Sequence, residues 1–200
     1  MNGFQEHLLE VNEEQYPEFH ITLIGSIYDI PELNEMLAGL KKLFEQPFAE
    51  NIKAQFIGTG TSEEFIQKIR AAVPPKNLIM RSRMSQLEAQ KEASRSQLLL
   101  VLGFRGMNGI IGTKPFEYMG VRRTLIQMPG DNDIMQQIIE ECNAGYCPST
   151  VEEFVEVVKT NYNEWKETGS IRYKGKISQI KRYSREEQVK KLLPFLETLA

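Results

Sequence analysis

A short segment in the second half of the chain combines a lysine, a proline and a glutamate in an order that suits a phosphate-bearing ligand. Pro115 is the predicted first residue of a helix, because the N–H that proline lacks would have no hydrogen-bond partner at that position. Lys114 is then the expected N-cap, and Glu117 lies in the first turn. Gly109 and Gly112 precede this helix, and glycine lets backbone N–H groups approach a ligand closely. The segment therefore predicts a diphosphate cradle in which Lys114 supplies a positive charge.

Glu117 has both a chemical role and a structural role open to it. A carboxylate can accept hydrogen bonds from the hydroxyl pair of a ribose, as acidic residues do in nucleotide-binding folds. The same carboxylate would stabilise the helix dipole. It is not part of a capping box, because the residue three positions earlier is Lys114 rather than serine or threonine. The residue types alone leave both roles open.

These residues need a scaffold, and the hydrophobic pattern predicts one in which strands alternate with helices. The predicted strands cover residues 20–24, 52–57, 77–80, 98–102 and 124–127, with a short extended piece around Tyr146. The predicted helices cover residues 32–44, a segment capped by Ser62, 85–94, a segment opened by Pro115, 133–142, 150–165 and 184–199. This alternation predicts an α/β fold, with a parallel sheet and helices on both of its faces.

The last predicted helix carries an apolar stripe that we expect to be buried. Pro194 lies within it and should kink it. The residues of the stripe are Val189, Leu192, Leu193, Leu196 and Leu199.

The loops that follow the predicted strands are the expected ligand-binding segments, because parallel sheets bind ligands beyond the carboxyl ends of their strands. They are Gly25-Ser26, Gly58-Thr59-Gly60, Arg81-Ser82-Arg83 and Gly103–Gly112. The second of them lacks the complete dinucleotide fingerprint, and glycine-rich loops are often only turns. The arginines of the third could be surface charges. The pattern alone predicts an α/β domain that binds a phosphate-bearing ligand.

The composition describes one ordinary globular domain and gives little sign of a nucleic-acid partner. The chain has 200 residues, of which 41% are hydrophobic and 26% are charged, enough for a single core. The net charge is −3, and the segment Arg172–Arg185 collects six Lys/Arg residues. We interpret this segment as solvated surface, with an anionic partner or a membrane surface as the alternative. We expect no nucleic-acid partner.

Neither a membrane span nor a metal site is predicted. The chain has no apolar run long enough to span a bilayer and no secretory leader. We therefore expect a cytoplasmic protein, with peripheral contact at the inner face of the membrane as the alternative. Cys142 and Cys147 have no second cysteine pair, and His7 and His20 are distant in sequence. This spacing does not fit zinc, so we expect reduced structural thiols and no metal or other cofactor.

The order of these segments resembles one enzyme family. The segments are Leu23–Asp29, Gln55–Gly60, Leu98–Leu102 and Lys114–Met119, and the Lys-x-Phe-Glu-Tyr element is the most specific of them. Together they resemble the C-terminal half of the family 4-like glycosyltransferases of the GT-B fold, in which two Rossmann-like domains face each other across a cleft. The resemblance covers residues 20 to 199. It implies a Rossmann-like, three-layer domain that binds a nucleotide-sugar donor.

The same resemblance implies roles for individual residues. Glu117 would hold the ribose hydroxyls, Lys114 and the neighbouring loop amides would face the phosphates, and Arg81 with Ser82 would lie near the base. The family is typically retaining and works without a metal. The expected nucleotide-sugar-binding residues are Gly25, Ser26, Gly58, Arg81, Ser82, Asn108, Gly109, Ile110, Lys114 and Glu117.

Two positions depart from the family's pattern. Many members carry an earlier glutamate, eight positions before the ribose-binding one, where this chain has Gly109. Many also have an arginine after the first loop glycine, where this chain has Ser26, and a lysine shortly beyond, where this chain offers none before Lys41. We therefore expect Lys114 to counter the phosphate charge, with Arg105 as a further candidate. The catalytic residues stay undefined.

Both ends of the chain also resemble parts of the larger enzymes. Asn2-Gly3-Phe4 resembles the stretch before their interdomain linker, and Tyr183–Glu186 resembles their closing segment. We interpret residues 1–19 as a linker remnant with Met1 as an added start, and residues 20–183 as the donor-binding domain. Residues 184–200 would form a helix that crosses back to a missing N-terminal acceptor domain, present in cis or as a separate subunit.

The expected function is that of the donor half of a hexosyltransferase, inactive alone, in polysaccharide or glycoconjugate synthesis. One alternative is a non-catalytic subunit that docks a partner through an exposed apolar face of the last helix, Leu192–Leu199. Another is a nucleotide-sugar 2-epimerase, which shares the GT-B architecture. The chain has no histidine after His20 to serve such an enzyme as acid or base. The base, the sugar and the acceptor are not defined by the sequence.

Overall fold

The computed structural model describes residues 2–59 and 62–197, with side chains up to residue 194. Met1, Gly60 and Leu199, and the side chain of Leu196, lie outside this range. The strands are β1 Phe19–Ile24, β2 Ile52–Ile57, β3 Leu78–Arg81, β4 Leu98–Leu102, β5 Thr124–Met128 and β6 Gly145–Tyr146. The α-helices are α1 Pro31–Phe44, α2 Glu63–Ala72, α3 Gln86–Arg95, α4 Lys114–Gly120, α5 Ile134–Glu141, α6 Val151–Thr168, α7 Ile177–Lys181 and α8 Arg185–Glu197. Short 3-10 helices, η1 Glu6–Glu10, η2 Pro47–Asn51 and η3 Pro75–Asn77, precede the first three strands.

The strands form one parallel sheet in the order β3-β2-β1-β4-β5-β6. The chain builds one half of this sheet outward from β1 and then crosses to build the other half outward from β4. Loops that follow β1 and β4 therefore leave the sheet side by side, at the point where an α/β sheet opens its ligand crevice. The prediction of a three-layer α/β fold with a parallel sheet is confirmed.

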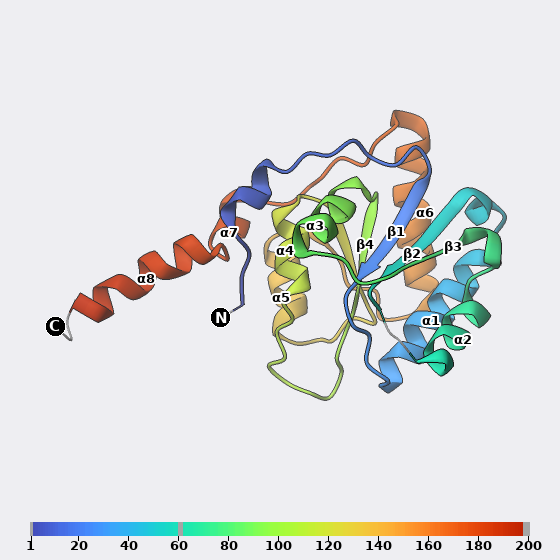
Figure 1. Cartoon of the computed structure of the whole chain (residues 1–200), viewed down its shortest axis with the longest axis horizontal. Coiled ribbons are helices and arrows are strands. Elements are labelled where there is room, and N and C mark those ends of the chain that lie inside the picture. Colours follow the sequence, from blue (N-terminus) through green and yellow to red (C-terminus); the bar gives the residue numbers. More distant parts are fainter. Residues whose placement is uncertain (1, 60–61, 198–200) are drawn as a thin grey trace.

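Helices cover both faces of the sheet (Figure 1). The cluster on one face contains residues of α1, α2 and α6, and the cluster on the other contains residues of α3, α4 and α5. The central strand β4 alternates between them, because Leu98 and Leu100 belong to the first cluster while Leu99 and Val101 belong to the second. This double burial is what an unbroken apolar strand predicts.

Side chains cap the N-termini of three helices, and the cap predicted at Ser62 is confirmed. The Ser62 side chain accepts a hydrogen bond from the Phe65 N–H at the start of α2. Ser85 and Glu88 form a capping box at the start of α3. Thr150 caps α6. These side chains satisfy amides that the first turn of a helix leaves without partners, so they define where each helix begins.

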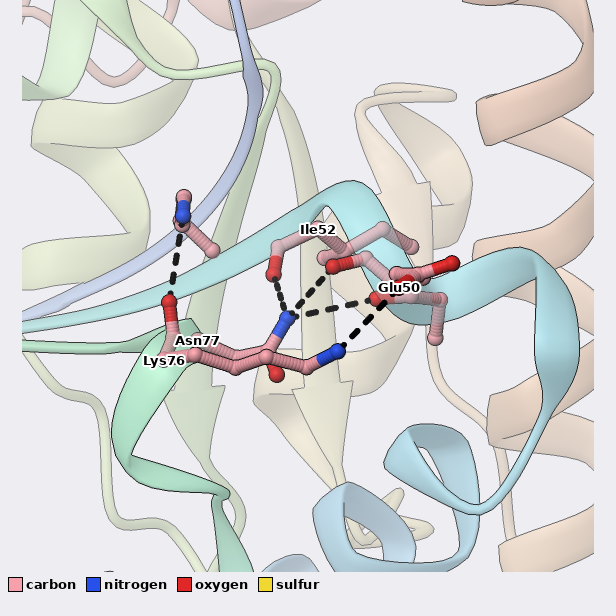
Figure 2. A network of polar contacts seen from close by, with 6 residues as sticks. Glu50, Ile52, Lys76 and Asn77 are labelled. Atoms are coloured by element: carbon pink, nitrogen blue, oxygen red, sulfur yellow. Dashed lines mark hydrogen bonds and ion pairs between the residues drawn. The ribbon is translucent and has the colours of Figure 1, made fainter.

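The strand β3 begins one residue later than predicted, and Asn77 explains why (Figure 2). Asn77 was expected to begin a strand, but it ends η3, and β3 begins at Leu78. Its side chain is buried and donates to the carbonyl oxygens of Glu50 at 2.9 Å and Ile52 at 2.8 Å. The amide thus ties the turn before β3 to the turn before β2.

The two ends of the chain differ in how they pack. Phe4 and Leu8 are fully buried in the cluster that contains α4, and Phe4 forms a bridge with Ser184. The helix α8 instead projects away from the sheet (Figure 1). The expected burial of its apolar stripe is wrong for three described residues, since Val189, Leu192 and Leu193 are between 47% and 56% exposed. Among the residues that the structure describes, no helix is long and apolar enough to cross a membrane.

Candidate functional site

Two adjoining hollows lie at the carboxyl ends of the central strands. The larger has a volume of about 550 Å³ and lies mainly between the loops that follow β1 and β4. The smaller, of about 390 Å³, lies toward β2 and α3. Both are lined by Ile24, Gly25, Ser26 and Lys114, so these residues form the junction between them. Sizes in this range suit small-molecule sites.

The crevice opens because β1 and β4 diverge before β1 ends. They pair only at Ile21 and Thr22, whereas β1 continues to Ile24. The Ile24 N–H donates instead to the Tyr118 hydroxyl, at 3.1 Å. Burial raises the pKa of Tyr118, so the hydroxyl is neutral. This bond ties the end of β1 to α4 and fixes Gly25 at the junction.

Gly25 has a backbone conformation that disfavours any side chain, although a Cβ atom would meet only ordinary van der Waals contact there. Its φ is +108°, a backbone conformation that residues other than glycine rarely adopt. A Cβ atom there would come within 3.5 Å of the Lys114 Cε. Glycine therefore lets the first loop turn directly beside the lysine, and Ser26 follows it along the junction.

The helix α4 presents Glu117 to the crevice and its neighbours to the core. Phe116 and Tyr118, the two aromatic residues on either side of Glu117, are fully buried and belong to the core. The helix begins one residue earlier than predicted. Thr113 occupies the N-cap position without a side-chain cap, and Lys114 rather than Pro115 is the first helical residue. Since Pro115 still lies in the first turn, its missing N–H costs no helical hydrogen bond.

Glu117 faces the smaller hollow with its carboxylate already engaged. Its Oε2 atom lies 2.6 Å from the Lys114 Nζ, and its Oε1 atom accepts a hydrogen bond from the Gln86 side chain at 3.1 Å. A carboxylate offers about four acceptor positions, so these contacts leave about two for a ligand. The ammonium group of Lys114 likewise has donors to spare, because only one is directed at Glu117.

The opposite wall of the smaller hollow comes from the loops after β2 and β3. Gly58 lines it with φ +64°, and a Cβ atom there would lie 3.3 Å from the Arg83 Cα. Arg83, which is not among the residues expected at the site, also lines this hollow. The signal was present, since Arg83 belongs to the loop after the third strand. The sequence does not define the last residue of β3, so it does not show which arginine of this loop reaches the hollow.

Arg81 and Ser82 line neither hollow, so the structure does not bring these two expected residues to the site. Arg81 forms an ion pair with Glu92 of α3 at 2.5 Å. The hydrogen bond to Glu92 raises the pKa of Arg81. Arg81 is the last residue of β3, and its side chain pairs with Glu92 of the neighbouring helix α3. Arg83 lies two residues further along the chain and lines the smaller hollow.

The glycine-rich loop after β4 contributes less than expected. Ile110 lines the larger hollow, but Asn108 and Gly109 line neither, and the Gly109 N–H donates to an Asp133 carboxylate oxygen at 2.5 Å. Arg105 does not provide the expected phosphate charge. Its guanidinium contacts Glu35 at 2.8 Å and the carbonyl oxygen of Gly130 at 2.9 Å, outside both hollows.

The polar residues of the chain do not assemble a metal centre within the described ranges. No group of three or more His, Cys, Asp or Glu side chains is arranged to hold a metal ion there. Both cysteines are free thiols, and burial raises the pKa of Cys142 to about 11 and that of Cys147 to about 12. They are therefore protonated and unreactive near neutral pH.

Comparison with known proteins gives a fold but no close relative. No family model and no curated protein matches the sequence. A variant of Staphylococcus aureus TarM, solved with fondaparinux, alpha-GlcNAc-glycerol and UDP, superposes with a TM-score of 0.63 at 15% identity. The alignment covers 92% of this chain and 36% of TarM. The pneumococcal O-GlcNAc transferase GtfA, solved with UDP and GlcNAc, gives 0.60 at 12% identity, over 93% of this chain and 37% of GtfA.

A third structure extends the comparison beyond glycosyl transfer. A protein described as a UDP-N-acetylglucosamine 2-epimerase, from Listeria monocytogenes, gives a TM-score of 0.55 at 10% identity, over 75% of this chain and 38% of that protein. The chain thus spans between 36% and 38% of the length of these three structures. The likeness and the strand order together show that the chain has a Rossmann-like fold, that of one half of the GT-B fold.

Proposed function

We propose that this chain is the nucleotide-sugar-binding domain of a retaining, metal-independent glycosyltransferase of the hexosyltransferase type. A domain or subunit that is not part of this chain would supply the acceptor site. The observation that carries the proposal is the pair of hollows that meet at Lys114, with the Glu117 carboxylate in one of them. A nucleotide sugar has the same organisation, because a charged diphosphate joins a nucleoside to a sugar.

The smaller hollow is the proposed nucleoside end. Glu117 there would accept hydrogen bonds from the ribose hydroxyl pair with its remaining acceptor positions, while Gln86 and Lys114 hold the carboxylate in place. Gly58 would allow close approach of the ligand, and Arg83 would take the place near the base that the resemblance implies for Arg81 and Ser82. The UDP that was solved in TarM and GtfA supports a nucleotide ligand for this fold.

The junction is the proposed diphosphate site. Lys114 would contribute positive charge, and the Gly25-Ser26 turn would let the phosphates lie against the backbone. Positive charge at this point would stabilise the nucleotide diphosphate as it departs, which is the electrostatic task of such a domain in glycosyl transfer. Of the glycine-loop residues expected at the phosphates, Ile110 lines the larger hollow, whereas Asn108 and Gly109 line neither hollow.

Discrimination between ribose and deoxyribose tests this proposal directly. We expect at least one of UDP, GDP, ADP and CMP to bind the chain in calorimetry, and its 2′-deoxy analogue to bind about tenfold or more weakly. Glu117→Ala should remove that preference even if the released Lys114 strengthens phosphate binding. Glu167→Ala is the matched control, because Glu167 is exposed near the end of α6. Absence of saturable binding below millimolar concentration, or an unchanged ribose preference in Glu117→Ala, would count decisively against the proposal.

A non-catalytic, partner-binding subunit is the second candidate function. The observation that favours it is the exposed apolar face of α8, formed by Val189, Leu192 and Leu193. Under this reading the chain would bind none of the four nucleotides, and its association with a partner would be lost when Leu192 and Leu193 are replaced by serine. An epimerase is less well supported, because His7 and His20 are the chain's histidines and neither lines a hollow.

A further inference from the structure

The larger hollow differs in chemistry from the smaller one. Its wall on the sheet side is formed by Leu23, Leu100 and Leu102, and Ile110, Ile111 and Met135 add to the apolar lining. Tyr28 and Phe104 stand at its loops with ring centroids 5.9 Å apart. The hollow at the sugar-proximal side of the junction is therefore mostly apolar, although a fully hydroxylated hexose carries a hydroxyl on nearly every ring carbon.

Three polar side chains of this hollow, those of Asn2, Gln127 and Asp131, are engaged within the protein, whereas the hydroxyls of Ser26, Tyr28 and Thr113 could still meet a ligand. Asp131 accepts hydrogen bonds from the Gln127 side chain at 2.6 Å and from the N–H groups of Asp133 and Gln136. That leaves about one of its four acceptor positions for a ligand. Asn2 donates to the Ile111 carbonyl oxygen at 2.6 Å. Each ligand hydroxyl placed here without a partner would lose its hydrogen bonds to water, which is costly.

We propose that the larger hollow receives the glycosyl group of a donor whose sugar presents a methyl group to the apolar lining, as a 6-deoxy sugar does at C6 and an N-acetyl sugar does at the end of its acetamido group. This inference rests on the proposed function, because Glu117 assigns the nucleoside to the smaller hollow and Lys114 assigns the diphosphate to the junction. The rest of the donor then extends into the larger hollow. A methyl group gains free energy by leaving water for this apolar wall and needs no hydrogen-bond partner there.

Matched donor pairs test the inference by calorimetry on the complete chain. UDP-N-acetylglucosamine is compared with UDP-glucose, and GDP-6-deoxymannose with GDP-mannose, so that each pair differs at one substituent. We expect the methyl-bearing member of the pair with the preferred base to bind about tenfold or more tightly, as is typical of one apolar group in a hydrophobic pocket. Equal or tighter binding of the hydroxylated member, with normal binding of the free nucleotide, would overturn this inference alone. Failure of every nucleotide to bind would overturn the proposed function as well.

Two variants locate the preference in the larger hollow. Leu102→Asn, at the end of β4, and Ile111→Asn, in the loop, should bring the ratio of the two affinities toward one while free nucleotide binds as before. The loop variant keeps the test available if the strand variant does not fold. Leu87→Asn is the control, because Leu87 is 59% exposed and lines neither hollow. An undiminished preference in both hollow variants would contradict the assignment.

Discussion

The direction of the Glu117 side chain is determined by the two residues beside it in sequence. Successive helical residues point in different directions, so burial of Phe116 and Tyr118 leaves the side chain between them at the crevice. Tyr118 also takes up the Ile24 N–H where β1 has separated from β4. The aromatic neighbours thus set both the aim of the carboxylate and the position of the first loop.

Removal of the Tyr118 hydroxyl should weaken both folding and ligand binding. In Tyr118→Phe the buried Ile24 N–H loses its acceptor, which should lower the free energy of unfolding by about 1–3 kcal/mol. Because Gly25 follows Ile24, nucleotide affinity should fall as well. Urea denaturation and calorimetry measure the two effects. Tyr146→Phe, in β6 and away from the crevice, should change neither, and equal behaviour of the two variants would refute the role given to Tyr118.

His20 should make stability depend on pH. Burial lowers its pKa from 6.5 to about 4, with smaller effects from Glu18, Lys53 and Glu92. Between these two values the unfolded chain binds a proton that the folded chain does not, so the free energy of unfolding falls as pH drops below about 6.5. At pH 5 the loss from this residue should be about 2 kcal/mol. It should be absent above pH 7.

A phenylalanine in place of His20 isolates this effect. His20→Phe keeps a ring that can stack on Tyr16, whose ring centroid lies 4.0 Å from that of His20, but it does not titrate. The difference in unfolding free energy between wild type and variant should therefore change between pH 7 and pH 5. His7→Gln, at an exposed histidine, is the control variant. A constant difference between wild type and His20→Phe would show that folding does not lower the pKa of His20.

The sequence predicts those residues of the candidate site whose positions are set by local signals, such as the end of a strand or the start of a helix. Gly25, Gly58, Lys114 and Glu117 all line the hollows, and each is near a strand end or a helix start. The choice between Arg81 and Arg83 depends instead on Glu92, a residue of another element that captures the first guanidinium. Such a partner is set by packing between elements, which a local pattern does not contain.

At the scale of elements, the turn before β3 should be a point of stability. Asn77→Ala removes a buried amide that donates to carbonyl oxygens of the turn before β2 (Figure 2), which should lower the unfolding free energy by about 2 kcal/mol. The neighbouring Lys76→Ala removes only an exposed ion pair with Glu50 and should have little effect. Urea midpoints compare the two variants. If both are equally stable, the buried network is not what orders the turn.

Most elements could be predicted because local signals and tertiary packing agree. The doubly buried strand β4 begins and ends as predicted, and the capped helix α3 does so to within one residue. Disagreements occur where another element decides. The N-terminus of α4 shifted by one residue, and the apolar stripe of α8 is exposed rather than buried. Helical periodicity predicts an apolar face but cannot say what covers it.

At the scale of the whole molecule, the two ends of the chain meet but contribute unequally to stability. Phe4 is 1% exposed, its N–H and carbonyl bond to Tyr183 and Arg185, and it fills space beside Gly120 of α4. Beyond this contact, α8 leaves the body of the domain and its apolar side chains meet solvent (Figure 1). The first segment therefore belongs to the core, while the last helix has an unpartnered face.

Matched substitutions at the two ends should separate these roles. Phe4→Ala empties a fully buried site and should lower the unfolding free energy by about 3–5 kcal/mol. A variant with Leu192→Ser and Leu193→Ser removes comparable apolar surface from solvent rather than from the core, so its stability should stay within about 0.5 kcal/mol of wild type. Urea denaturation of the isolated chain measures both. A large loss in the double-serine variant would mean that α8 packs on the domain in solution, and its apolar face would then not be available to another domain or subunit.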